Sequence, residues 1–153
     1  MLKSPGALLG GVVATLLLGG CVAHPIGPAR TFGKYKGKAV TTAESALSAV
    51  ETARLTADAA ARGNAFGPYA GAVISEAEES ARGVRATFAS VQPPDQQADA
   101  LSSELDGLLA AAVTHLTAAR VAARRGDLPT LGRVAQPLTA DADALQAFID
   151  GHQ

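Results

Sequence analysis

The sequence predicts an all-α protein, an up-down-up-down antiparallel four-helix bundle preceded by a signal peptide and a flexible linker. Alanine, the best helix former, accounts for 34 of the 153 residues. Apolar residues recur at intervals of three and four through four segments, which is the helical period. No alternating β-branched run is present. Short connections between the segments favour antiparallel neighbours.

Residues 1–20 are predicted to be a lipoprotein signal peptide. Residues 7–18 form an uncharged apolar run, too short to span about 30 Å of hydrocarbon as a helix. The run ends in Leu18-Gly19-Gly20-Cys21, which resembles the bacterial lipobox. The resemblance implies cleavage before Cys21 and attachment of a diacylglyceryl group to its thiol. An ordinary secretory signal with a chance cysteine is the alternative.

Residues 21–38 are predicted to be a flexible linker, because prolines and glycines interrupt the segment. The linker carries four cations: Arg30, Lys34, Lys36 and Lys38. A basic residue gains about 1 kcal/mol near an anionic membrane. These residues are therefore candidates for contact with anionic lipid or wall polymer, and a solvated spacer is the alternative. The rest of the chain is acidic and cancels the charge of the linker, which leaves a net charge of −1. This small net charge predicts no nucleic-acid partner.

Residues 39–153 are predicted to form the bundle, and its first helix is expected at 41–62. Thr41 and Glu44 fit a capping box at the start, and Gly63 fits the end. Arg54 lies on the apolar stripe of this helix. It is expected to snorkel to the surface, to pair with an acid, or to line a pocket for an anionic headgroup.

Three further helices are predicted at 68–91, 95–125 and 128–150. The second is expected to bury Phe66 and Phe88, and a Pro-Pro pair ends it. The third has the longest uninterrupted Leu/Ala stripe. Asp127 is expected to cap the fourth, and Pro137 to kink it. A looser three-helix core, with the helix at 41–62 packed peripherally, is the alternative arrangement.

The residues that could carry out catalysis are few. His24 lies in the linker and His152 lies near the end of the chain, so neither is expected to be held rigidly. His115 lies on an apolar stripe, where a role as an acid or base is the alternative to a histidine satisfied at the edge of the core. No Glu-x-x-His pair, nucleotide-binding loop or nucleophile elbow is present. We therefore expect no catalytic residue, no metal site, no cofactor and no enzymatic activity.

The lipobox, the Ala/Arg/Asp-rich composition and two segments resemble small, uncharacterised lipoproteins of high-GC Gram-positive (actinobacterial) bacteria. The segments are Phe88-Ala89-Ser90-Val91-Gln92-Pro93-Pro94 and Ala123-Arg124-Arg125-Gly126-Asp127. The resemblance implies an outer-leaflet anchor and brings no activity. We expect a non-enzymatic module at the extracytoplasmic face of the cell membrane that binds or positions an envelope partner. The alternative is a carrier or sensor of a small apolar or amphipathic ligand, bound between the helices near His115 and Arg54.

Overall fold

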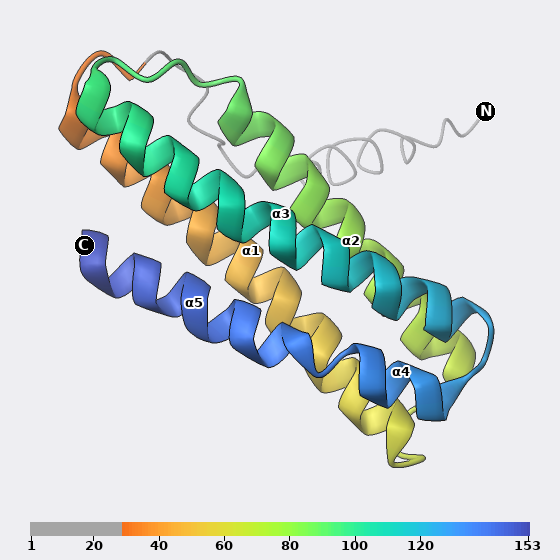
Figure 1. The fold of residues 1–153 in the computed structure, drawn as a ribbon. Helices are drawn as coiled ribbons and strands as arrows, with labels where there is room; N and C mark the ends of the chain where they lie inside the picture. Colours follow the sequence, from red (N-terminus) through yellow and green to blue (C-terminus); the bar gives the residue numbers. More distant parts are fainter. Residues whose placement is uncertain (1–28) are drawn as a thin grey trace, which may run out of the picture.

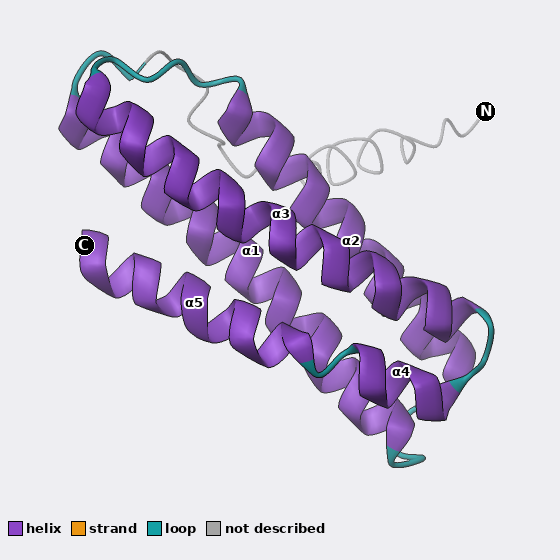
Figure 2. Ribbon diagram, viewed as in Figure 1, coloured by secondary structure: helices purple, strands orange, loops and turns teal. Residues whose placement is uncertain are grey.

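The computed structural model describes residues 29–153, and this part of the chain contains helices and no strand (Figure 2). The helices are α1 (Phe32–Ala61), α2 (Gly67–Ala89), α3 (Gln96–Arg124), α4 (Leu128–Val134) and α5 (Pro137–His152). They run up and down in chain order, with α4 and α5 together forming the fourth arm (Figure 1). The predicted four-helix bundle is confirmed. The predicted signal peptide, Cys21 and residues 22–28 of the predicted linker lie outside the described residues.

The helix α1 lies at the centre of the bundle, because, like α3, it contacts all four other helices. Its buried side chains are small apart from Tyr35: Ala39, Ala43, Ala46, Ala49, Val50, Ala53, Ala57 and Ala60. Small side chains allow neighbouring helix axes to approach closely. The alternative in which the first helix packs peripherally is therefore wrong.

Larger side chains on α3 and α5 fill the rest of the core. Four leucines of α3 are buried: Leu101, Leu105, Leu109 and Leu116. The apolar residues buried by α5 are Leu138, Ala142, Leu145, Phe148 and Ile149. Asp95 caps α3, since its side chain accepts a hydrogen bond of 2.9 Å from the backbone N–H of Ala98. The sequence placed this helix to within one residue at each end.

The start of α1 differs from the prediction. The helix begins at Phe32 rather than near residue 41, and Thr31 is its N-cap, accepting a hydrogen bond of 3.4 Å from the backbone N–H of Lys34. Thr41 and Glu44 lie inside α1, so the predicted capping box is wrong. Lys34, Lys36 and Lys38 are consequently helical rather than part of a flexible linker.

Tertiary packing explains this early start. The Tyr35 side chain is fully buried, and its ring centroid lies 5.4 Å from that of Phe88 on α2. Burial of an aromatic side chain contributes roughly 1.5–3 kcal/mol, and an aromatic pair adds about 0.5–1.5 kcal/mol. Gly33 and Gly37 each cost about 0.5–1 kcal/mol in a helix. The packing of the two rings therefore offsets the cost of the glycines that predicted a linker. The Tyr35 hydroxyl reduces the net gain, because it is buried without a hydrogen-bond partner among residues 29–153.

The fourth arm is interrupted rather than kinked. The helix α4 ends at Val134 and α5 begins at Pro137. Pro137 has no N–H to donate to the carbonyl of Arg133, and Gln136 reaches that oxygen only at 3.4 Å. Asp127 caps α4 as predicted, with Oδ1 accepting a hydrogen bond of 3.0 Å from the N–H of Thr130.

Glycines with positive φ end the two long helices as predicted, Gly63 at 75° after α1 and Gly126 at 68° after α3.

Phe66 is 76% exposed, which corrects the prediction that it is buried. Among residues 29–153, no helix is long and apolar enough to cross a bilayer.

Candidate functional site

The structure does not bring His115 and Arg54 together. His115 on α3 faces Asp141 of α5, with 2.7 Å between Nδ1 and Oδ2. Arg54 on α1 pairs with Glu51 at 2.6 Å. The hydrogen bond to Glu51 first, and then nearby carboxylates including Asp143, raise the pKa of Arg54. Asp141 and Asp143 are about 200° apart around α5, so the two predicted contact residues lie on different sides of that helix.

His115 is a bridge between helices. Asp141 is 9% exposed, whereas the His115 side chain is 35% exposed. A carboxylate on Nδ1 fixes the orientation of the imidazole and directs Nε2 away from Asp141. Among residues 29–153 this is the only hydrogen bond of the imidazole, and no hydroxyl reaches it. His115 is therefore a hydrogen-bonded histidine at the edge of the core.

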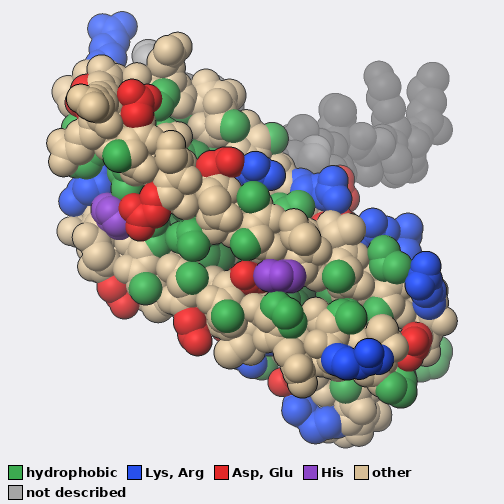
Figure 3. All heavy atoms as spheres, viewed as in Figure 1, with side chains coloured by type: hydrophobic (Ala, Val, Ile, Leu, Met, Phe, Trp, Pro, Cys, Tyr) green, Lys and Arg blue, Asp and Glu red, His purple; other side chains and the backbone are tan. Residues whose placement is uncertain are grey.

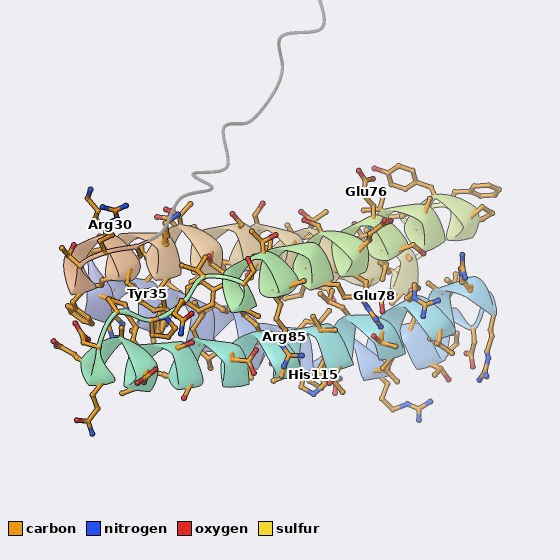
Figure 4. The ribbon with its side chains drawn as sticks, turned by 90° about the horizontal axis from the view of Figure 1, so that it is seen from above. Arg30, Tyr35, Glu76, Glu78, Arg85 and His115 are labelled. Atoms are coloured by element: carbon orange, nitrogen blue, oxygen red, sulfur yellow. The ribbon has the colours of Figure 1, made fainter. Side chains whose placement is uncertain are left out.

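The most connected polar group of the described chain is Glu78, which stands next to the exposed Glu79 and two residues after the exposed Glu76 in the sequence. Glu78 is 5% exposed and points between α2 and α3, whereas Glu76 points outward (Figure 4). Its Oε1 accepts hydrogen bonds from Arg82 Nη2 at 2.7 Å and from Thr117 Oγ1 at 2.6 Å. Its Oε2 accepts one from Arg120 Nε.

Burial and hydrogen bonding act in opposite directions on this carboxyl. Removal from water acts to raise the pKa of Glu78, but hydrogen bonds from Thr117, Arg82 and Arg120 and the charge of Arg120 outweigh it. The pKa of Glu78 therefore lies below its usual value. The geometry is that of an ionised carboxylate locking α2 to α3, and both arginines are used in holding it.

A second ion pair joins the same two helices. Arg85 Nε and Nη2 donate to the two carboxylate oxygens of Asp106 at 2.7 and 3.0 Å. The hydrogen bond from Arg85 is the main cause that lowers the pKa of Asp106. A bidentate pair of this kind fixes the orientation of the two side chains as well as the distance between them.

The start of α1 carries the predicted membrane-contact cations. Arg30 and Lys34 are exposed, and Arg30 projects outward beside the start of α1 (Figure 4). Lys36 and Lys38 are half-buried, and Lys36 Nζ lies 3.5 Å from the carbonyl oxygen of Gln153. The C-terminus therefore lies at the same end of the bundle, which we call the tether end.

His152 lies toward the tether end too, and it is held rather than loose. Its Nδ1 donates to the carbonyl of Phe148 at 2.7 Å, and the two rings lie 4.4 Å apart. This corrects the prediction that His152 is not positioned. His24 lies outside the described residues.

The opposite end of the bundle holds the connection from α1 to α2 and the connection from α3 to α4; we call it the distal end (Figure 1). Phe66 and Tyr69 are exposed there, at 76% and 61%. Leu55, on the last two turns of α1, is the third large hydrophobic residue exposed in the described chain.

A groove of about 380 Å³ lies between the C-terminal half of α3 and the short helix α4. Its α3 wall includes Thr114, Ala118 and Val121, and its α4 wall includes Thr130 and Val134. Neither His115 nor Arg54 lines it. A ligand was expected between His115 and Arg54, and the groove therefore lies elsewhere in the bundle.

Residues 29–153 contain no group of three or more His, Cys, Asp or Glu side chains arranged to hold a metal ion. Comparisons with known protein families, with curated protein sequences and with solved structures gave no match.

Proposed function

We propose that this protein is a lipoprotein anchored in the cell membrane through Cys21, and that its extracytoplasmic bundle is a non-enzymatic module that positions an envelope partner. The lipobox sequence Leu18-Gly19-Gly20-Cys21 supports the anchor. The proposal assigns binding to the bundle and no catalytic role to His115.

The observation that carries this proposal is the separation of two features along α1. The buried Ala29 and the start of α1 lie at the tether end, whereas the exposed rings of Phe66 and Tyr69 lie at the distal end. A helix of 30 residues is about 45 Å long. Exposed aromatic side chains are enriched at protein interfaces. A bundle tethered at one end would thus present an aromatic tip well away from the membrane.

The charges of the tether end fit the same orientation. Exposed cations gain about 1 kcal/mol each near an anionic leaflet, and Arg30 and Lys34 are exposed beside the tether. Their attraction to the leaflet would hold the tether end down and leave the distal end facing outward.

The anchor is tested by labelling cells with a palmitate analogue. Wild type is expected to be labelled and to sediment with membranes, and Cys21→Ala is expected to lose both properties. Cys21→Ala that still carries label, or that stays membrane-bound without it, contradicts the anchor.

The tip is tested by placing a photo-crosslinking residue at Tyr69 or, as a matched exposed position near the tether end, at Ser103. Crosslinking in intact cells from position 69 should give one discrete protein adduct that position 103 does not give. The adduct should disappear in Phe66→Ser. Equal adducts from both positions, or an adduct that survives Phe66→Ser, contradict docking at this tip.

A further inference from the structure

The distribution of unpaired arginines draws attention to the groove between α3 and α4. The residues from 39 onward contain eight arginines. Five of them form ion pairs with carboxylates: Arg54, Arg62, Arg82, Arg85 and Arg120. The other three, Arg124, Arg125 and Arg133, form no ion pair within residues 29–153, and the same holds for Arg30 at the tether end. All three lie at the α3–α4 corner, where Lys and Arg side chains gather on the molecular surface (Figure 3).

The one carboxylate that lines the groove does not neutralise this corner. Asp127 is engaged as the cap of α4, where it accepts hydrogen bonds from Thr130. Those hydrogen bonds are the main cause that lowers the pKa of Asp127, and the charges of Arg133 and Arg125 add to it. Two arginines thus act on one carboxylate that is already hydrogen-bonded, and Arg133 Nη2 also donates to Thr130 Oγ1 at 3.0 Å. With Arg124 on the last turn of α3, the corner keeps a positive charge.

The walls of the groove are small and apolar. Ala118, Val121 and Ala122 contribute methyl groups from α3, and Val134 faces them from α4. The hydroxyl of Thr114 donates to the carbonyl of Ala110 at 2.9 Å, so its hydrogen is already used within the helix. The lining residues of α3 follow one face from Thr114 to Arg125, a length of about 16 Å. Such a trough suits a narrow, flexible hydrocarbon chain.

We propose that this groove binds a long-chain fatty acid, with its methylene chain along α3 and its carboxylate against Arg125, the one arginine that lines it. The volume of about 380 Å³ fits one chain, and the guanidinium group of Arg125 matches a carboxylate. The diacylglyceryl group expected on Cys21 carries no charge, so it does not complement this arginine. This site goes beyond the proposed docking function and involves neither Phe66 nor Tyr69.

The test uses the full chain in phosphatidylcholine nanodiscs and a palmitic acid analogue with a photoreactive diazirine on its chain. Mass spectrometry should place the adduct on residues 114–134. Unlabelled palmitate should compete it away, and hexadecylamine should compete about tenfold less well, because the charge of its head group is reversed. An adduct elsewhere in the bundle, or equal competition by the amine, overturns the proposal.

Variants locate the two halves of the site. Arg125→Gln is expected to weaken labelling about tenfold, and Ala118→Phe should abolish it by filling the trough. The control Arg62→Gln removes an exposed arginine from the same end and should label as wild type. Thermal melting of each variant establishes that it is folded.

The Cys21→Ala chain separates a free fatty acid from the protein's own lipid. Labelling equal to wild type supports a free fatty acid as the occupant. Labelling that appears only in Cys21→Ala overturns the proposal, because the anchor's acyl chain would then occupy the groove.

Discussion

Asp141 and His115 form a polar contact between α5 and α3, with 2.7 Å between Oδ2 and Nδ1. Asp141 is 9% exposed, so its carboxylate has little access to water. A buried polar group that loses its partner costs about 1–3 kcal/mol. The pair therefore holds the fourth arm in a defined position against α3.

His115→Ala is expected to lower the free energy of unfolding by about 1–2 kcal/mol, because Asp141 stays buried without its partner. Asp141→Ala in the same background should then add little further loss. Urea unfolding of the two single variants and the double variant measures this coupling. Strictly additive losses would mean that the two side chains do not act as a pair.

Glu78→Gln is expected to destabilise the protein by about 2 kcal/mol. The change keeps the size of the side chain but removes the charge that holds Arg82 and Arg120. Glu79→Gln, a change of the exposed neighbour, should stay within about 0.5 kcal/mol of wild type. Chemical unfolding of both variants at pH 7 makes the comparison, and equal effects would refute the buried lock.

The Glu78 lock should also weaken in acid. Its folded-state pKa lies below that of an exposed glutamate, about 4.3, so the unfolded chain binds the proton more readily. The stabilisation is therefore complete above about pH 4.3 and declines as the pH falls through the folded pKa. The stability difference between wild type and Glu78→Gln should be constant from pH 7 to pH 5.5 and shrink toward pH 3. A difference that grows in acid would reverse the assigned sign.

Two glycines should respond to alanine in opposite ways. A Cβ at Gly83 meets nothing within 4 Å, so Gly83→Ala should raise stability by about 0.5–1 kcal/mol. A Cβ at Gly132 would lie 3.0 Å from the Cβ of Ala61, so Gly132→Ala should push α4 from α1 and lower stability.

Thermal melting of Gly83→Ala and Gly132→Ala, each compared with wild type, measures these changes in stability. The loss from Gly132→Ala should become smaller in an Ala61→Gly background, where the opposing methyl group is absent. The same loss in both backgrounds would show that this contact is not the cause.

The sequence was most informative where local signals agreed. The α3 helix carries a leucine stripe from Leu101 to Leu116 and an Asp95 cap, and these features depend only on nearby residues. The start of α1 was missed because Gly33 and Gly37 predict an irregular segment. The opposing signal is the burial of Tyr35 against Phe88, which is 53 residues away in the chain.

The polar contacts were harder to predict for the same reason. Glu78 stands among Glu76 and Glu79, and only its partners on α3 distinguish it from them. In the chain, Asp141 is hard to distinguish from Asp143, although they face different neighbours. His115 was correctly placed at the edge of the core, but its partner depends on how α5 lies across α3.

The central position of α1 has a mechanical consequence. A pull on the proposed anchor would reach the bundle at the N-terminal end of α1, next to the buried Ala29. Because α1 contacts all four other helices, such a force has to slide its full length past its neighbours rather than peel one helix from the surface. Under the proposed anchor, the load would therefore be shared along the core through the contacts of α1 with its four neighbours.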